Sequence, residues 1–442
     1  MITNEVRRAR GVGCMRPLQG WRIFSALLVG GLVIVFSINN RPLLQAESAS
    51  AQHENSNEVR PFRIHIDNEV LEDLEWRLLR TRFPQAIEGS GWTYGTDVSY
   101  LKTLVEYWHT DFDWRKEERE LNQFPQFKTT IDGLDVHFIH QRSPEPDALP
   151  IIMIHGWPGT FFEFSKVIDS LADPVSDGES AENAFHVVVP SLPGYGFSER
   201  PRQSGHSRRR TGAIFAELMR RLGYSQYAIQ AGDVGASVAA MMALNDEEHV
   251  VGLQLNSCSG VPSDPDDPEA GLTEEEIIRM TERRAYFSEN ERGYQRIQGT
   301  RPQTLGYGLN DSPAGLAAWI IEKYRKWCDC DGDPERVFTK DELLTTVMIY
   351  WVTETATSAA RYYYEGMHIP EPPYVPLERR VMVPTGCTVF PGELGFTPRR
   401  WAENRFNVKR FSYMERGGHF AALEQPVLFS EELRAFFSTL RE

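Results

Sequence analysis

The sequence predicts an α/β protein with a mostly parallel, doubly wound sheet that is interrupted by a helical insertion and preceded by a meander. Four short, nearly continuous apolar runs alternate with stretches of helical length, at 150–156, 186–191, 227–233 and 250–257. Strands buried on both faces have this texture, and their alternation with helices indicates parallel pairing with helices on both faces. Residues 262–373 are helical in pattern and rich in aromatic side chains, and sheet texture returns at 380–390 and 409–419. We therefore expect one core, 146–261 with 374–442, that carries a helical cap.

The first sixty residues predict a leader and a polar tether. Arginines precede an uncharged run from Ile23 to Ile38, which is longer than most signal-peptide cores but shorter than the ~20 residues that span a bilayer comfortably. A small-x-small cleavage site at Ala49-Ser50-Ala51 favours export with cleavage near Ala51, whereas its distance from the apolar run, about a dozen residues, favours a retained membrane anchor. The second alternative is slightly preferred. Residues 46–60 read as a tether, so folded structure is expected from about Pro61.

Residues 61–145 predict two helices ahead of a β-meander. Apolar residues at Val70, Leu74 and Leu78 have helical spacing, and Pro84 follows. A second helix is predicted over 100–118. Asp132-Gly133 then separates two alternating runs, as the turn of a β-hairpin does.

Composition excludes some partners. The formal net charge of −15 and the isoelectric point near 5.3 argue against nucleic acid, because phosphate contacts need clustered Lys and Arg. The five cysteines form an odd set without zinc-type spacing, which we interpret as structural or incidental thiols: Cys14, Cys258, Cys328, Cys330 and Cys387. No metal and no other cofactor is expected.

The strongest chemical signal is Ala231-Gly232-Asp233-Val234-Gly235, which follows a buried strand and precedes a helix. Small residues two positions before and after Asp233 permit the tight turn of a nucleophile elbow, here with aspartate where serine is usual, and this predicts an α/β-hydrolase fold. The competing interpretation is that Asp233 only caps the following helix. A motif match alone does not decide between them.

A second motif, His155-Gly156-Trp157-Pro158-Gly159, ends the first apolar run of the core. In the α/β-hydrolase fold the oxyanion hole combines the amide after the nucleophile with one from this loop, which nominates the main-chain N–H groups of Val234 and Trp157. We interpret His155 as part of the scaffold.

The base and its orienting acid are expected after the last two strands, because the order in this fold is nucleophile, acid, histidine. His419 follows a Gly-Gly pair at the end of the final strand, and a helix is expected near Glu424. Glu393 follows the strand that ends at Phe390. The alternatives are a structural histidine and a surface glutamate.

From about Pro61 to the C-terminus the chain resembles the microsomal-type epoxide hydrolases in its HGWPG loop, its aspartate elbow, FPGEL at 390–394 and RGGHF at 416–420. The resemblance implies an N-terminal segment that wraps the core, a membrane-directed leader, and two cap tyrosines that act as acids on the epoxide oxygen. The matching positions are Tyr294 and Tyr363, with Tyr362 and Tyr364 as neighbours that leave the second assignment open by one residue. The family usually has Trp after the nucleophile, where this chain has Val234, which puts the range of substrates in doubt more than the mechanism.

The expected activity is hydrolysis of a small apolar epoxide by water through an alkyl ester of Asp233, with a tyrosine as acid and His419 as base. A haloalkane dehalogenase shares the aspartate and histidine, but usually stabilises halide with a Trp N–H that Val234 lacks. An esterase is weaker, because Ser237 lies four residues beyond the nucleophile position. A catalytically dead, membrane-tethered binding protein is the alternative from another class.

Overall fold

The computed structural model describes residues 58–256, 258–368 and 379–441, which belong to a single compact unit beginning at His53. The predicted leader, its cleavage site, most of the tether and Cys14 lie outside the described residues. Within the described ranges, no helix has both the length and the apolarity that crossing a membrane requires.

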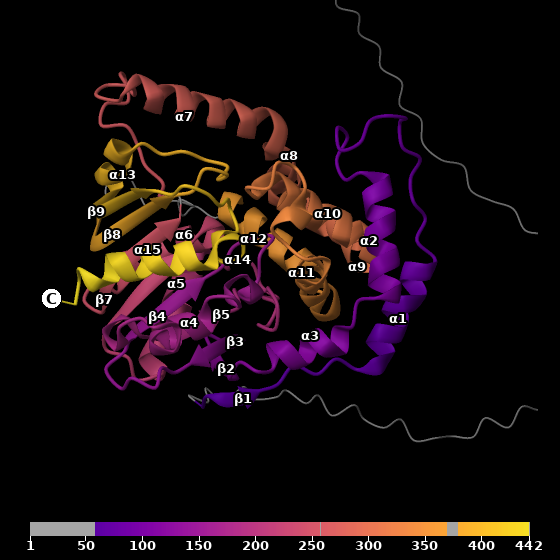
Figure 1. The fold of residues 1–442 in the computed structure, drawn as a ribbon, viewed down its shortest axis with the longest axis horizontal. Coiled ribbons are helices and arrows are strands. Elements are labelled where there is room, and N and C mark those ends of the chain that lie inside the picture. Colours follow the sequence, from indigo (N-terminus) through magenta and orange to yellow (C-terminus); the bar gives the residue numbers. More distant parts are fainter. Residues whose placement is uncertain (1–57, 257, 369–378, 442) are drawn as a thin grey trace, which may run out of the picture. The chain divides into compact units, whose positions relative to one another are not determined.

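A nine-stranded sheet in the order β1-β2-β3-β5-β4-β6-β7-β8-β9 forms the core (Figure 1). Its parallel part confirms the predicted α/β-hydrolase fold: every pair from β5 through β9 is parallel. Those strands are β4 (Leu149–Ile154), β5 (Phe185–Pro190), β6 (Tyr227–Ala231), β7 (Val250–Asn256), β8 (Val381–Val389) and β9 (Phe406–Tyr413). Four of them coincide with the apolar runs, because strands covered on both faces need no polar alternation.

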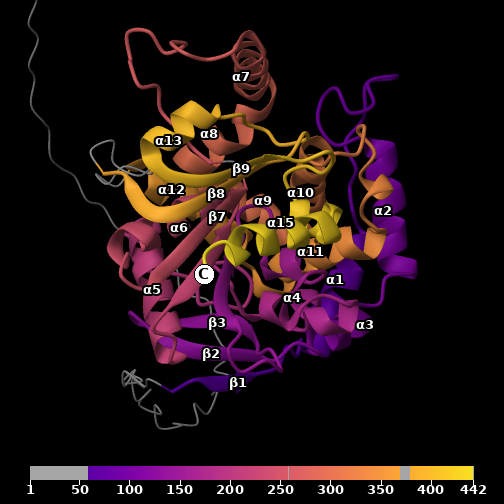
Figure 2. The same cartoon turned by 60° about the vertical axis from the view of Figure 1, so that its left-hand side comes forward.

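Helices cover the sheet on both faces (Figure 2). On one face α5 (Arg208–Arg221) packs against α6 (Asp233–Asn245), which lies on β4, β6, β7 and β8. On the other face lie α4 (Ile168–Ala172) and α15 (Pro426–Ser438), joined by a hydrogen bond from the Arg434 guanidinium to the Ser170 carbonyl at 2.7 Å. A layered arrangement of this kind leaves the carboxyl ends of the strands open for a site.

The N-terminal segment contains three helices, so the prediction of one helix over 100–118 is wrong. The helices are α1 (Asn68–Leu79), α2 (Val98–Thr110) and α3 (Trp114–Leu121). The break falls at two aspartates: Asp111 ends α2, and the Asp113 side chain accepts a hydrogen bond from the Arg115 amide to begin α3. An Asp cap of this kind offers the backbone an alternative to continuing the helix.

The predicted hairpin is confirmed. β1 (Arg60–Phe62) pairs with β2 (Gln126–Ile131), and β2 pairs antiparallel with β3 (Leu134–Gln141). Asp132 and Gly133 form the turn, both with positive φ, 54° and 74°. Two consecutive left-handed residues give the turn a twist that matches that of the flanking strands.

The cap is inserted between β7 and β8. Its helices are α7 (Glu274–Tyr286), the π-helix η4 (Phe287–Glu291), α8 (Arg292–Thr300), α9 (Pro302–Asp311), α10 (Pro313–Trp327), α11 (Lys340–Thr353) and α12 (Ala356–His368). In both ribbon views α7 lies beside α13 (Arg399–Arg405). The Arg284 guanidinium stands 4.7 Å from the Trp401 ring of α13, so α7 packs onto the core as well as continuing into α8.

The interpretation of the cysteines as thiols is wrong for four of them. Cys258, just after β7, forms a disulfide with Cys387 in β8, and Cys328 forms one with Cys330. The first pair is 129 residues apart in sequence, and only the pairing of β7 with β8 brings the two together. Spacing along the chain could not reveal this.

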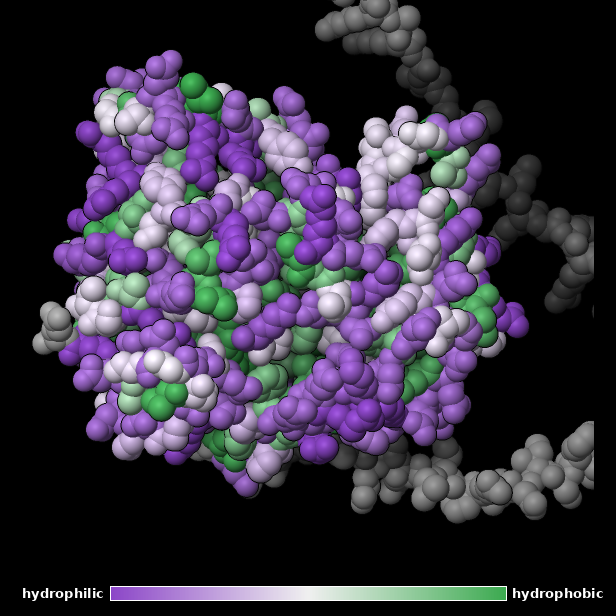
Figure 3. All heavy atoms as spheres, viewed as in Figure 1, coloured by the Kyte–Doolittle hydropathy of each residue, from purple (hydrophilic) through white to green (hydrophobic). Residues whose placement is uncertain are grey.

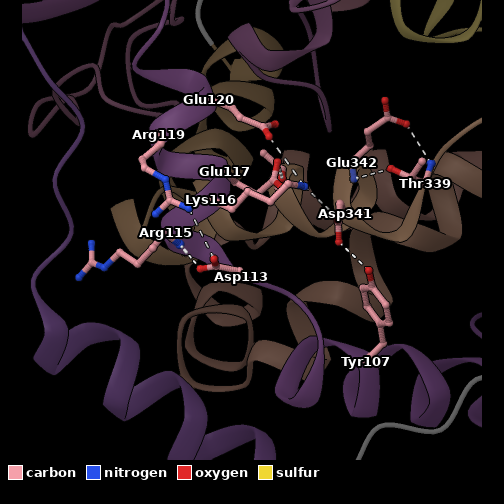
Figure 4. Close-up of polar contacts among 11 residues, drawn as sticks. Tyr107, Asp113, Arg115, Lys116, Glu117, Arg119, Glu120, Thr339, Asp341 and Glu342 are labelled. Carbon is pink, nitrogen blue, oxygen red and sulfur yellow. Dashed lines mark hydrogen bonds and ion pairs between the residues drawn. The ribbon is translucent and has the colours of Figure 1, made fainter.

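A polar network attaches the N-terminal segment to the cap (Figure 4). The Tyr107 hydroxyl of α2 donates to Asp341 at 2.8 Å, and the Lys116 ammonium of α3 lies 3.0 Å from Glu117 and 3.3 Å from Asp341. Asp341 belongs to the first turn of α11, where a carboxylate also interacts favourably with the helix dipole. The contact joins two segments that are more than two hundred residues apart in sequence.

The largest buried side chains are mostly aromatic, and Trp327, Tyr324 and Tyr350 of the cap are among them. On the face seen in Figure 3 hydrophilic residues predominate, with hydrophobic ones in scattered patches. The aromatic residues of the cap therefore serve mainly as interior packing, and several of them surround the residues considered next.

Candidate active site

Asp233 lies at a strained bend between β6 and α6. Its φ is +49°, a conformation that non-glycine residues rarely adopt. Gly235 is required nearby, because a Cβ there would stand 2.3 Å from the Ile154 carbonyl oxygen of β4. The Asp233 side chain does not cap α6; its Oδ1 accepts a hydrogen bond from the Trp157 amide at 2.8 Å. This geometry fits a nucleophile elbow and not the capping alternative.

The loop after β4 approaches the Asp233 carboxylate closely. A Cβ on Gly156 would lie 2.2 Å from Asp233 Oδ1, so only glycine leaves room. His155 points away: its Nδ1 lies 3.0 Å from the Gly156 carbonyl oxygen and its Nε2 accepts from the Leu192 amide at 3.1 Å. Burial lowers the pKa of His155 to about 4, so the ring is neutral and structural. Val234, the second residue of α6, has one of the first-turn amides that no helix carbonyl satisfies.

His419 stands between two carboxylates. Its Nδ1 lies 2.8 Å from Glu393 Oε1 and its Nε2 lies 3.6 Å from Asp233 Oδ2. Burial lowers the pKa of His419, but the charges of Glu393 and Asp233 outweigh it and raise the pKa to about 10. For Glu393, burial acts in the opposite direction and raises the pKa. The charge of His419 outweighs burial, so the pKa of Glu393 is lowered overall. Glu393 therefore stays ionised and holds the imidazole.

The sequence predicts His419 at the end of the final strand, but the structure places it on a loop after that strand. β9 ends at Tyr413, six residues earlier, and the following short helix α14 covers Ala421–Glu424. Gly417 has φ +106°, and a Cβ on Gly418 would stand 2.5 Å from the Trp327 carbonyl oxygen. The His419 amide donates to that same carbonyl at 2.9 Å. The Gly-Gly pair thus lets the loop lie against α10 of the cap.

The two cap tyrosines lie on the Trp157 side of the site. The Tyr294 ring stacks on the Trp157 ring with centroids 4.8 Å apart, and Tyr363 meets Trp157 edge-on at 6.0 Å. Burial, and then the Asp233 charge, raise the pKa of Tyr294 well above its usual value; for Tyr363 burial, Tyr294 and Asp233 do the same. Both phenols therefore remain protonated at neutral pH.

The two neighbours of Tyr363 in sequence, Tyr362 and Tyr364, face away from Trp157. The Tyr362 hydroxyl donates to Thr211 of α5 at 2.9 Å. Tyr364 is 37% exposed and stacks on His368. Of the three consecutive tyrosines, only Tyr363 adjoins both Trp157 and Tyr294.

Sequence reasoning did not single out Glu163, which belongs to a 3₁₀ turn after the HGWPG loop. Burial raises the pKa of Glu163 to about 8, and His419 and Asp233 are close enough to affect it electrostatically. Glu291, Lys323 and Trp327 of the cap were missed as well. The available signals were the carboxylate of Glu163 within the aromatic run FFEF and Lys323 within WIIEKYRKW, whose glutamate is Glu322; nothing local marks Glu291.

The arrangement brings together a carboxylate nucleophile, a base held by the Glu393 carboxylate, an amide donor and two phenols. The Asp233 side chain is 20% exposed whereas the His419 and Glu393 side chains are 8% exposed, so the carboxylate is the accessible member. Among the described residues no group of three His, Cys, Asp or Glu side chains is arranged to hold a metal ion.

Comparisons with known proteins point to one family. Residues 59–164 match the family model described as epoxide hydrolase N terminus, and residues 150–280 match the model of the alpha/beta hydrolase fold. Epoxide hydrolase 1 of Sus scrofa is 40% identical over 406 residues, covering 87% of this chain and 89% of the pig protein. The crystal structure of juvenile hormone epoxide hydrolase from the silkworm Bombyx mori has a TM-score of 0.81 at 30% identity, covering 88% of this chain and 96% of that one. The epoxide hydrolase of Aspergillus niger has a TM-score of 0.77 at 32% identity, covering 87% and 97%.

Proposed function

The chain belongs to the microsomal-type epoxide hydrolase family of the α/β-hydrolase superfamily, and from this we propose that it hydrolyses apolar epoxides to vicinal diols through an alkyl ester of Asp233. The observation that carries the proposal is the position of the Asp233 carboxylate: it accepts from the Trp157 amide at 2.8 Å and stands 3.6 Å from His419 Nε2. One carboxylate thus meets both an oxyanion donor and a base.

In the first half-reaction Asp233 opens the ring. Oδ2 is the attacking oxygen, because Oδ1 is engaged by the Trp157 amide. It forms a bond to one epoxide carbon while the bond from that carbon to the epoxide oxygen breaks. The emerging alkoxide takes a proton from a cap tyrosine, Tyr294 or Tyr363, which becomes a phenolate. The product is a hydroxyalkyl ester of Asp233.

In the second half-reaction His419 activates water. Nε2 removes a proton from water, and the resulting hydroxide attacks the Asp233 ester carbonyl, whose oxyanion the Trp157 and Val234 amides stabilise. Collapse expels the second alkoxide, which takes the proton back from His419. The proton left on the Asp233 carboxyl returns to the tyrosinate. Esterification removes the Asp233 charge, one of the causes that raise the pKa of His419, so the imidazole becomes a free base more readily in the intermediate.

The substrate is proposed to be apolar because the walls of the site are aromatic. Trp157, Tyr294 and Trp327 contact one another, with centroids of Tyr294 and Trp327 5.2 Å apart. Rings of this kind contribute large apolar contact area with few polar atoms. At position 234, next to the nucleophile, valine offers a smaller apolar surface than a tryptophan would. A haloalkane dehalogenase is not favoured, since two phenols suit an oxygen leaving group.

An isotope experiment tests the covalent mechanism. One turnover in ¹⁸O-water should leave the label in the peptide that contains Asp233, because the oxygen of water adds to the Asp233 carbonyl and remains there. Asp233→Asn should form no ester and carry no label. Direct attack of water on the epoxide would instead put the label in the diol and leave Asp233 unlabelled, which would refute the proposal.

We also propose that the leader directs the protein to a membrane, either as a retained anchor or as a signal cleaved near Ala51. The two disulfides support this, because disulfides persist mainly in oxidising compartments outside the cytosol. Comparing the size and the membrane partition of the full chain with a form lacking residues 1–51 distinguishes the two. A full-length product found in the soluble cytosolic fraction would contradict both.

A further inference from the structure

A buried ion pair in the cap has no part in the reaction described so far. Glu291, the last residue of the π-helix η4, and Lys323 in α10 lie 3.3 Å apart, with side chains that are 2% and 8% exposed. Glu291 also accepts from the Trp327 indole N–H at 2.9 Å, and the Lys323 ammonium lies 2.5 Å from Glu322. Glu291 precedes Tyr294 by three residues, and Lys323 precedes Trp327 by four.

Stability alone is a weak reason for such a pair. Removing two charges from water costs several kcal/mol per ion, and apolar residues of similar size often stabilise a fold as well or better. The π-helix next to it is a second unusual feature, and single π-turns are frequent at functional sites.

The Lys323 ammonium faces the ring of Tyr294. It stands 5.2 Å from that ring's centroid and 5.8 Å from the centroid of Trp327. A cation within about 6 Å of an aromatic face is attracted to it, more strongly when water is excluded. Trp327 in turn meets the His419 ring edge-on at 5.0 Å. Lys323 thus supports the acid side of the site directly and the base side only through Trp327.

Tyr363 lacks this support. Its ring adjoins Trp157 and Tyr294, and none of the cations in the described part of the chain stands over its face. After burial and Asp233, the hydroxyl of Tyr363 lowers the pKa of Tyr294 while Glu291 and Glu393 raise it, and the pKa of Tyr363 is raised by burial, Tyr294 and Asp233. Of the two phenols, Tyr294 is the one with an ammonium beside its ring, and this cation attracts negative charge placed there.

We propose that the two cap tyrosines have different roles in ring opening. Tyr294 transfers its proton to the epoxide oxygen, whereas Tyr363 only donates a hydrogen bond to that oxygen. Lys323 is a positioning residue that stabilises the Tyr294 phenolate. The proposal rests on the proposed function. Proton transfer leaves one negative charge on the Tyr294 oxygen, which the nearby ammonium attracts through a low-dielectric interior. Glu291 and Glu322 hold the ammonium in place.

A double-mutant cycle on the ring-opening step tests this. The rate of ester formation at Asp233 is measured in single turnovers for the wild type, Lys323→Gln, Tyr294→Phe and Tyr363→Phe, and for Lys323→Gln combined with each Phe variant. We expect Lys323→Gln to slow ring opening roughly tenfold in the wild-type and Tyr363→Phe backgrounds. In the Tyr294→Phe background it should change the rate by less than about twofold, because the phenolate it would stabilise no longer forms.

Equal slowing in the Tyr294→Phe background would overturn the proposal, as would coupling to Tyr363 in place of Tyr294. Lys102→Gln is the matched control: this exposed lysine stands 5.6 Å from the Phe83 ring in a similar contact, and ring opening should be unchanged. If Lys323→Gln does not fold, Lys323→Met with Glu291→Gln leaves no charge imbalance between the two and enters the same cycle. A wild type that forms neither ester nor diol would refute the proposed function, whereas a working wild type without the coupling refutes this inference alone.

Discussion

Replacing Gly156 with alanine is expected to remove most of the activity while leaving the fold in place. The added Cβ would lie 2.2 Å from Asp233 Oδ1, 2.4 Å from its Cβ and 2.7 Å from its Cγ, all far inside van der Waals contact. The Asp233 side chain or the HGWPG loop must therefore move by on the order of 1 Å, a misplacement that costs about 10²-fold in rate. The hydrogen bond from the Trp157 amide at 2.8 Å cannot survive such a shift.

Misplacement of the attacking carboxylate should slow ester formation by about 10²-fold. Loss of the Trp157 donor, which serves the oxyanion of the second half-reaction, should slow ester hydrolysis by about 10²–10³-fold. Rapid-quench single turnovers followed by intact-mass analysis measure both rates. Gly308→Ala is the control: Gly308 lies in α9 with open space where its Cβ would go, and the change should leave the rate intact and add about 1 kcal/mol of helix stability. Folding of both variants is compared by thermal unfolding.

Wild-type ester formation in the Gly156→Ala variant would refute the reasoning, since it would mean that the close approach of this loop to Asp233 is not needed for attack. Slowing by Gly308→Ala of similar size would show that any change of glycine disturbs the enzyme. Only the combination of a folded, slow Gly156→Ala variant and a normal control supports the assigned geometry.

Three further outcomes are expected. His419→Gln should still open the ring but accumulate the Asp233 ester, visible as an added substrate mass; rapid release of diol would show that another group is the base. In the wild type the rate of ester hydrolysis should rise with pH, because only neutral His419 accepts a proton and its pKa is about 10 before the Asp233 charge is lost and lower afterwards; stopped-flow rates that fall between pH 6 and 9 would contradict this. Replacing Cys258 and Cys387 together by alanine should lower the free energy of unfolding by about 3–5 kcal/mol, because their disulfide closes a loop of 129 residues, whereas the Cys328–Cys330 pair, two residues apart, should matter much less; equal effects in denaturant unfolding would count against the loop-closure argument.

The parallel core could be predicted because a strand that is buried on both faces consists of a nearly continuous run of apolar residues. The elbow and the HGWPG loop were visible for a related reason: a carboxylate bend needs small neighbours, and Gly235 and Gly156 are where a Cβ would strike Ile154 and Asp233. The steric requirements of each turn are therefore visible in its local sequence as glycines.

Features that depend on distant partners were not visible. The break between α2 and α3 follows from aspartate caps, and the pairing of Cys258 with Cys387 follows from strand order. The place of His419 is set by the Trp327 carbonyl of the cap, ninety or so residues earlier, and not by the strand before it. The burial of Glu163 and the position of Lys323 beside Tyr294 depend on the tertiary fold, which the spacing of residues along the chain does not contain.

The disulfide between Cys258, just after β7, and Cys387, within β8, closes a covalent loop that contains the whole cap. A protease that cuts the exposed stretch 264–271 ahead of α7 would therefore not set the cap free. The nicked protein should migrate as one species until a reductant is added, and should keep the acids of the cap over the nucleophile in the meantime.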